Sequence, residues 1–385
     1  MLDRFLAYSR EFEGGDTHIY PGDLSISARR FADVVDVMVK MDLVNRDGDG
    51  CCATAKALSL AAQPEKVEAL FPVDEEVADT LPWEADHEGR PFQPVANPPP
   101  AMSWDDYRAH VRRVWPTLLN SDRQRNERVF QQFLERHPCL LPDAYSYFQR
   151  GATPCTGGVF TQPELPGFRA KRPDFMVMSY DSEALTVLLI EIEAPGKKWS
   201  TKTGTSTAEF TQARDQLLQW KTWFREPENR VQFCKLYRID QRVLETRQMM
   251  PRYALIYGRR AEVESKPAFA KKRSEIASHD EVLMTYDRLA PSSRLADQPT
   301  LRLSRSEVDT KVEVVSVPPT LQLGPHTARE FGNWTNLRDA VRANPLITAE
   351  RRQFLLERLD YWDGWIQTPP NRKAPNSRIE DGYGE

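Results

Sequence analysis

Between residues 103 and 298 the chain alternates between two patterns of apolar residues, which predicts a domain of mixed helices and strands. Apolar residues at helical spacing predict helices over 103–120, 123–141, 208–224 and 269–278, and the second pattern breaks at the His137-Pro138 step. Apolar runs predict strands over 158–165, 173–180, 185–194, 251–258 and 281–287. Helices and strands interspersed in this way are typical of an α/β domain with a central sheet.

The rest of the chain divides into four further parts. We expect an N-terminal domain over 1–80, a linker over 81–103, the α/β domain over 104–298, strands and helices that pack on or extend it over 299–368, and a disordered tail over 369–385. The linker is predicted because the stretch from Leu81 to Trp104 has six prolines and almost no periodic apolar pattern. The tail is predicted from a similar composition.

The N-terminal domain has the order helix, two short strands, helix. Apolar residues recur at helical spacing from Phe31 to Met41, and the turn "RDGDG" at 46–50 then separates the two strands. This order resembles a winged helix-turn-helix, in which Arg29 and Arg30 would lie near the exposed start of the recognition helix. The resemblance implies either DNA contact or a dimerisation or docking module.

Composition limits the class of protein further. The 385 residues include 52 Lys and Arg against 56 Asp and Glu, a net charge of −4, so any face that binds DNA phosphates must be local. The mean hydropathy is −0.59, and no apolar run approaches the roughly 18 residues of a membrane span. We therefore expect a cytoplasmic protein with no membrane partner. The five cysteines and six histidines show no disulfide-like or zinc-binding spacing.

Three acidic residues interrupt an otherwise apolar predicted hairpin. The stretch "RPDFMVMSYDSEALTVLLIEIEAP" has its turn at 181–184. Pairing about the centre of that turn places Asp174 opposite Glu191, and Glu193 shares the face of Glu191 because side chains alternate along a strand. Like charges at such distances repel one another unless a cation lies between them. Mg²⁺ or Mn²⁺, which prefer oxygen ligands, meet that need.

These residues resemble the site of the PD-(D/E)xK nuclease superfamily, in which a proline-aspartate on one strand and an acid-x-lysine on its partner build a Mg²⁺ site that cleaves phosphodiesters. Pro173-Asp174 and Glu191-Ile192-Glu193 occupy those places. A wider order of motifs from Arg125 to Leu289 is similar to the Shedu anti-phage nuclease family: "NERVFQQFLERHPCLL", "RPDF", "LIEIEAP", "FTQARDQLLQW", "YALIYGRR" and "VLMTYDRLAP". The resemblance implies a restriction-endonuclease-like central mixed sheet flanked by helices, and a homo-oligomer, commonly a tetramer.

Glu193 departs from the family pattern, which has lysine there to stabilise the attacking hydroxide or the charge of the transition state. Three interpretations are open. Glu193 can join the metal ligands or accept the proton of the water. Lys197 or Lys198 can supply the missing cation from the following loop. Alternatively, the protein has lost catalysis and kept binding.

The resemblance also implies roles for neighbouring residues. Asp174 and Glu191 would bind Mg²⁺, Gln212 would orient the water or the phosphate, and Glu127 would be an outer metal ligand. The alternatives are an ordinary polar helix residue for Gln212 and a solvated surface acid for Glu127.

Basic residues on both sides of the predicted hairpin are candidates for phosphate contacts. Those before the first strand can equally be a solvated approach to it. The segment "PGKKWSTKTGTSTAEF" lacks the glycine-lysine order of a phosphate-binding loop, and we expect a flexible basic loop that contacts nucleic-acid backbone. The candidates are Arg169, Lys171, Arg172, Lys197, Lys198 and Lys202.

The first hypothesis is therefore a Mg²⁺-dependent DNA endonuclease of bacterial anti-phage defence. The alternative is a catalytically degenerate DNA-binding or regulatory protein with a nuclease-like fold. A transposon-end or repair nuclease is a third possibility with the same chemistry.

Overall fold

The computed structural model divides the chain into two compact units, Met1–Asp86 and His87–Glu385. It describes residues 18–19, 39, 44–47, 50–54, 93, 95–149, 151, 153–154, 157–168, 172–239, 241–265, 271–272, 275–305, 310–324 and 334–367.

The described residues of the first unit include a small antiparallel sheet. Strands β1 (His18–Ile19), β2 (Val44–Asp47) and β3 (Gly50–Ala53) have the order β1-β3-β2. The predicted turn and its two short strands are thus confirmed as the β2–β3 hairpin. The predicted helices, with Arg29 and Arg30, lie outside the described residues, so the winged helix stays a prediction.

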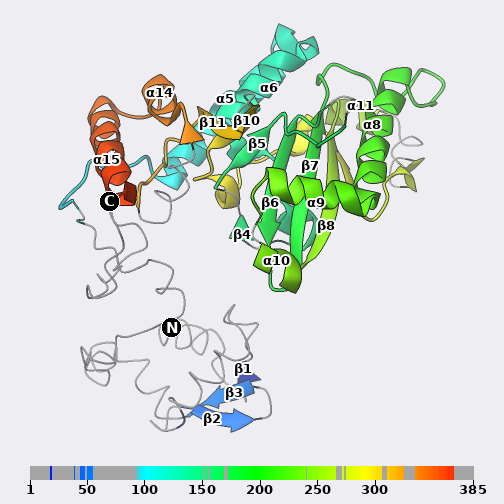
Figure 1. Ribbon diagram of the computed structural model, residues 1–385. Helices are drawn as coiled ribbons and strands as arrows, with labels where there is room; N and C mark the ends of the chain where they lie inside the picture. The colour runs from blue at the N-terminus through cyan, green and yellow to red at the C-terminus, as the bar shows by residue number, and fades with distance from the viewer. Residues whose placement is uncertain are drawn as a thin grey trace. The chain divides into compact units, whose positions relative to one another are not determined.

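In the described part of the second unit, nine strands form a single mixed sheet (Figure 1). Its order is β12-β11-β10-β5-β6-β7-β8-β9, with β4 paired to β6. Strand β6 is antiparallel to β7, and β7, β8 and β9 are parallel. The strands are β4 (Thr153–Pro154), β5 (Val159–Thr161), β6 (Phe175–Tyr180), β7 (Ala184–Ile192), β8 (Gln248–Ile256), β9 (Glu281–Met284), β10 (Thr300–Arg305), β11 (Thr310–Ser316) and β12 (Trp334–Thr335).

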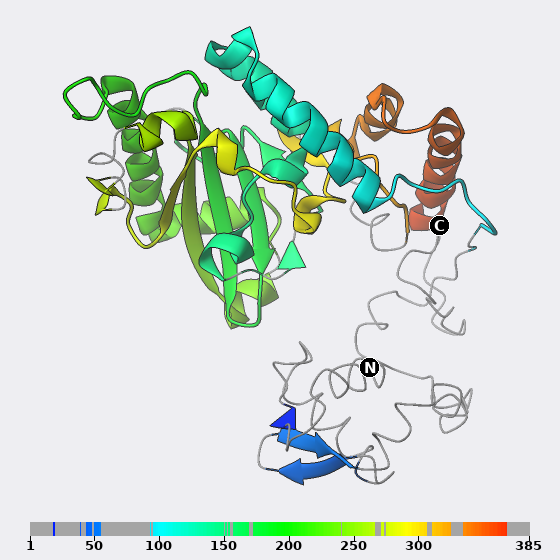
Figure 2. The same ribbon diagram turned by 180° about the vertical axis from the view of Figure 1, so that it is seen from behind.

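Two layers of helices cover this sheet from opposite sides (Figures 1 and 2). Helices α5 (Trp104–Leu119) and α6 (Glu127–Arg136) pack on one face, and α8 (Ala208–Arg225) and α9 (Pro227–Leu236) pack on the other. None of the described helices has the length and apolar character needed to cross a membrane. The remaining helices are α7 (Ala144–Phe148), α10 (Gln241–Thr246), α11 (Arg260–Glu264), α14 (Leu337–Ala343) and α15 (Ala349–Gln367), with short 3-10 turns η2 (Asp122–Arg125), η3 (Pro138–Leu140), η4 (Tyr286–Arg288) and η5 (Ser293–Leu295).

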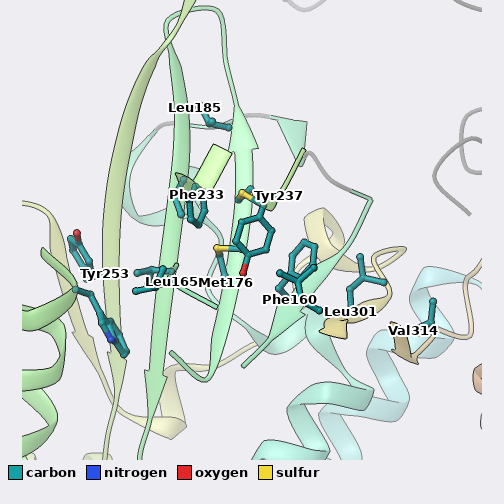
Figure 3. Close-up of a cluster of buried hydrophobic side chains, with 14 of the residues drawn as sticks. Phe160, Leu165, Met176, Leu185, Phe233, Tyr237, Tyr253, Leu301 and Val314 are labelled. Carbon is teal, nitrogen blue, oxygen red and sulfur yellow. The ribbon is translucent and has the colours of Figure 1, made fainter. Parts of the chain in front are cut away.

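Strand β7 separates two hydrophobic clusters. Every residue of β7 is buried, and because side chains alternate, Val187 and Leu189 join the cluster under α8 and α9, whereas Leu188 and Ile190 join the cluster under α5 and α6. Figure 3 shows part of the first cluster, in which Met176, Phe233 and Tyr237 lie close together and Leu301 and Val314 continue it along the sheet. The carboxylates of the hairpin are therefore exceptions within a strand that is core on both faces.

Local sequence accounts for the start and the buried side of α8. Thr207 caps α8, because its hydroxyl accepts a hydrogen bond from the N–H of Phe210 at 3.2 Å. The buried side of α8 follows a helical period from Phe210 through Ala213 and Leu217 to Trp220. This helix therefore lies along the face of the sheet that carries Val187 and Leu189.

Candidate active site

The C-terminal ends of β7, β8 and β9 meet at the same rim of the sheet. Ile192 pairs with Ile256, which in turn pairs with Met284. The next residues extend this ladder, because the N–H of Glu193 donates to the carbonyl oxygen of Ile256 at 3.0 Å and that of Tyr257 donates to the carbonyl oxygen of Met284 at 2.9 Å. Such rims commonly carry the ligand sites of α/β proteins.

The β6–β7 hairpin has the predicted register. Phe175 pairs with Ile190, so continuing the register by one residue places Asp174 opposite Glu191. The turn lies at 181–184, where the N–H of Asp181 donates to the carbonyl oxygen of Ala184 at 3.0 Å.

All three acids of the hairpin belong to the face covered by α8. Met176 and Leu189 are in the cluster under that helix. Asp174 lies two residues before Met176, and Glu191 and Glu193 lie two and four residues after Leu189, so alternation places them on the same side. Only 7% of Asp174, 0% of Glu191 and 6% of Glu193 is exposed.

Asp174 is held by the backbone around it. The N–H of Ile192 donates to its Oδ2 at 2.8 Å. Its carbonyl oxygen accepts from the N–H of Gln162 at 2.8 Å and from Nε2 of Gln131 at 3.4 Å. Gln131 also donates to the hydroxyl of Thr161 at 2.9 Å. The carboxylate thus has a fixed position at the start of β6.

Glu193 forms an ion pair with Lys197, four residues further along. About a third of the lysine side chain is exposed, whereas that of the glutamate is almost wholly buried. The cation that the crowded acids require is thus supplied, at Glu193, by the loop after β7. The second interpretation of Glu193 requires a contact of this kind.

The loop that carries Lys197 is anchored at both ends. Before the lysine, the N–H of Gly196 donates to the carbonyl oxygen of Gln124 at 2.8 Å. After it, the N–H groups of Trp199 and Ser200 donate to the two carboxylate oxygens of the buried Glu262 at 3.1 and 3.3 Å. Within 195–200, both flanks of the two lysines are thus tied by hydrogen bonds to other elements, and the flexibility expected of this segment stays a prediction.

Close packing against β8 reinforces this anchor. Trp199 is wholly buried and lies against Gly258, which has φ +61°. A Cβ atom at position 258 would lie 2.5 Å from Nε1 of Trp199 and 3.1 Å from the carbonyl oxygen of Lys197. Glycine is required here both by the positive φ and by the close approach.

Tyr286, the first residue of η4, is wholly buried in the cluster under α5 and α6. Burial raises its pKa well above the ordinary value of 10.0, and the negative charges of Asp174, Glu127, Glu193 and Glu191 raise it further. The negative charges that act on this buried hydroxyl thus come from α6 and the hairpin. They are the same four acids that the sequence resemblance assigns to a metal site.

The other predicted residues have more varied positions. Gln212 is exposed on α8, next to the buried Ala213. The guanidinium of Arg172 pairs with Glu164 at 3.1 Å. Lys198 and Lys202 are exposed, and Arg169 and Lys171 lie outside the described residues.

The donor set fits Mg²⁺ if two carboxylates hold it. Within the described parts of the chain, no group of three or more His, Cys, Asp or Glu side chains is arranged to hold a metal ion. Mg²⁺ does not need such a cage, since it usually keeps several waters and binds one or two carboxylates plus substrate phosphates. Asp174 and Glu191 are two such carboxylates, and the buried hydroxyl of Tyr286 has no hydrogen-bond partner among the described residues.

A hollow of about 660 Å³ opens beside Lys197. It lies where η2, the loop after β7 and α11 meet. Its basic lining consists of Arg125, Lys197, Lys198 and Arg259, and its acidic lining of Asp122 and Glu262. Arg259 is paired with Asp287 at 2.8 Å, whereas Arg125 and Lys198 are exposed.

The sequence reasoning missed Tyr286 and Gln131. Tyr286 falls inside the strand predicted over 281–287, but β9 ends at Met284. The available signal was its place just after a buried strand parallel to β7, where polar groups meet the same rim. Gln131 carries no such signal, because nothing in the spacing of α6 indicates a contact with residue 174.

Comparison with known proteins covers the segment that builds this site. Residues 124–290 match the family described as Shedu protein SduA, C-terminal. Comparisons with curated proteins and with solved structures give no significant match. From α6 to η4, and so over all four acids, Lys197 and Tyr286, the chain is similar to the C-terminal domain of SduA.

Proposed function

We propose that this protein is a Mg²⁺-dependent DNA endonuclease that acts in anti-phage defence. The observation that carries the proposal is the placement of Asp174 opposite Glu191 at the rim of the sheet, with the Lys197 ammonium on Glu193. The similarity of residues 124–290 to the SduA C-terminal domain supports it.

Asp174 and Glu191 would hold the metal ion from neighbouring strands. Bound Mg²⁺ polarises a phosphate oxygen and lowers the pKa of its water. The hydrogen bond from the N–H of Ile192 keeps the Asp174 carboxylate oriented, so little reorganisation is required when the ion binds. Glu127, half-buried at the start of α6, would act as an outer partner.

Glu193 and Lys197 would act as a pair rather than as two further ligands. The ammonium of Lys197 can stabilise negative charge on the phosphate and the attacking oxygen, which is the role of the family lysine. The carboxylate of Glu193 holds that ammonium and can accept a proton from the attacking water. A cation reaching the site from the loop would replace the one missing from the strand.

The hollow beside Lys197 would receive the DNA backbone. Arg125 and Lys198 are exposed there, and phosphate contacts position DNA without reading its sequence. This local basic surface reconciles DNA binding with a net charge of −4. Lys202, in the exposed part of the same loop, extends it.

The principal test is metal-dependent cutting of plasmid and linear DNA by the full chain. We expect cleavage with Mg²⁺ or Mn²⁺, and a loss of about 100-fold or more in Asp174→Ala and in Glu191→Ala. The matched control is Glu350→Ala, which removes an exposed carboxylate from the first turn of α15. Cutting that persists in both site variants would overturn the proposal.

A second candidate is a DNA-binding protein without nuclease activity. The observation that favours it is Glu193 at the place of the family lysine, with its charge paired by Lys197. Gel-shift assays on the same variants separate the two functions. Binding without cutting, unaffected by metal and by Asp174→Ala, supports this second candidate.

A further inference from the structure

Glu262 is a buried acid in the wall of the hollow beside Lys197. Only 8% of the residue is exposed. A carboxylate in this wall repels the phosphates that the hollow would receive, and burying a charge costs folding free energy unless hydrogen bonds compensate for it. The presence of this acid therefore requires a reason other than DNA binding.

Two backbone N–H groups of the loop after β7 supply those hydrogen bonds. The N–H of Trp199 donates to Oε2 of Glu262 at 3.1 Å, and the N–H of Ser200 donates to Oε1 at 3.3 Å. Both oxygens of the carboxylate thus bind the same short segment, which directly follows the two lysines. Hydrogen bonds to an ionised carboxylate are stronger than those between neutral groups, so Glu262 fixes the backbone of the loop at this point.

Glu262 is itself held in place by the end of β8 and by η4. The N–H of Arg260, at the start of α11, donates to Oδ2 of Asp287 at 2.7 Å. Nε of Arg259 donates to the same carboxylate at 3.0 Å. The hydroxyl of Ser265 donates to the carbonyl oxygen of Glu262 at 2.8 Å. Helix α11 therefore connects the loop to two fixed elements through a single side chain.

The position of the Lys197 ammonium depends on this backbone, because the charge is carried on a flexible stem. Before the lysine, the N–H of Gly196 donates to the carbonyl oxygen of Gln124 at 2.8 Å. The N–H of Lys197 itself donates to the carbonyl oxygen of Ala194 at 3.0 Å. With Glu262 holding the other side, the lysine backbone is fixed from both directions, and its ammonium contacts Glu193.

We propose that Glu262 is a positioning residue for DNA cleavage, which holds the backbone of Lys197 so that the lysine ammonium stays at Glu193. This inference rests on the proposed function, in which that ammonium stabilises negative charge on the phosphate. Glu262 acts through the two backbone N–H groups and needs no contact with DNA or metal. Misplacing a group at a reaction centre by about 1 Å can cost about 100-fold in rate.

The first test is Glu262→Gln in the full chain, measured without DNA or metal. The substitution keeps the shape of the side chain but turns an NH₂ group, which is a donor, towards one of the two N–H donors. Lysines are labelled with trace acetic anhydride, and mass spectrometry gives the rate at each position. We expect Lys197 to react about fivefold faster in the variant, the factor that corresponds to losing an ion pair of this kind. Lys221 on α8 should keep its rate.

The second test is a double-mutant cycle on single-turnover DNA cleavage. We expect Glu262→Gln to lower the rate about tenfold in the wild type, and to have no further effect in Lys197→Met, which already lacks the ammonium. A role in stability alone would lower the rate by the same factor in both backgrounds. Glu264→Gln is the matched control, because Glu264 is exposed on the same helix. It should behave like the wild type in both tests.

Each contrary outcome has a distinct meaning. If the wild type cuts DNA and Lys197 reacts at the wild-type rate in Glu262→Gln, the positioning role is overturned and the proposed nuclease function stands. Faster labelling of Lys221 together with Lys197 would show a general loosening of the fold, and the inference would fail. Equal losses in both backgrounds of the cycle would also overturn it. If the wild type cuts no DNA, the proposed function fails and the role of Glu262 in cleavage fails with it.

Discussion

At the residue scale, Glu193 and Lys197 form an ion pair at the end of a core strand. A buried carboxylate without a cation would be strongly unfavourable next to Glu191. The loop supplies that cation four residues later. The pair therefore accounts both for the tolerance of glutamate at position 193 and for a positive charge close to the other acids.

A charge exchange tests whether the pair as such matters. Lys197→Glu places two carboxylates together, and we expect it to reduce DNA cleavage about 100-fold. Adding Glu193→Lys restores an ion pair with reversed polarity and returns lysine to the strand position of the family. The double variant should therefore recover a large part of the cleavage rate measured under single-turnover conditions.

Lys202→Glu is the control for the charge exchange, because it changes the same charge in the exposed part of the same loop. Its effect should be confined to DNA affinity and should disappear at saturating protein. A double variant no more active than Lys197→Glu alone would contradict a paired role and would indicate that Glu193 has a separate function.

The residue scale also shows what sequence could and could not predict. The opposition of Asp174 and Glu191 follows from the symmetry of a tight hairpin, and the register confirms it. The contact of Lys197 with Glu193 could be named only as one option, because loop residues have no periodic rule. Tyr286 was missed because its significance depends on neighbours that are far away in the sequence.

At the scale of elements, the strongly patterned helices and strands were the predictable part. Helices α5, α6 and α8 and strands β6 and β7 lie where apolar spacing indicated them. Helix α9 was not predicted. It begins with Pro227 and buries only Phe233 and Cys234, so its sequence shows little helical periodicity. Strand β5 is shorter than predicted because Pro163 follows it.

The end of α6 gives the fold a dependence on pH. His137, which follows the helix, is buried and hydrogen-bonded through Nδ1 to the hydroxyl of Tyr107 at 3.2 Å. Burial, followed by the positive charges of His110 and Arg136, lowers its pKa from 6.5 to about 3. The folded protein thus keeps this ring neutral at pH values where the unfolded chain binds a proton.

Stability should therefore fall as the pH decreases from about 6.5 towards 3. Between pH 7 and pH 5 this group alone should lower the free energy of unfolding by about 2 kcal/mol. Urea denaturation of the wild type and of His137→Phe over this range measures the effect. The variant should lose less stability on acidification. Parallel pH profiles would contradict the assignment of this loss to His137.

At the scale of the whole molecule, the segment after residue 299 is part of the sheet. Thr300 in β10 pairs with Val159 in β5. The buried guanidinium of Arg351 in α15 donates to the carbonyl oxygens of Pro99 and Leu321 at 2.8 and 2.9 Å. The C-terminal helices thus connect the start of the second unit to its last strands.

This arrangement predicts different outcomes for two truncations. The fragment 87–385 keeps both hydrophobic clusters of the second unit and should melt cooperatively. The fragment 87–298 loses β10 to β12 and leaves β5 as an unpaired edge, so it should aggregate or be digested rapidly by protease. Circular dichroism and limited proteolysis compare them. A stable 87–298 fragment would show that the last strands are dispensable.

The contact between Trp199 and Gly258 affects which positions of this protein can be substituted during evolution. The hydrogen bonds of a strand fix the backbone position of a lysine on that strand. The backbone position of Lys197 is instead fixed by the packing of the Trp199 indole against Gly258. Any side chain at 258 would displace the indole and the lysine backbone together. Purifying selection is therefore expected to fall on a glycine that lies outside the proposed metal and DNA contacts.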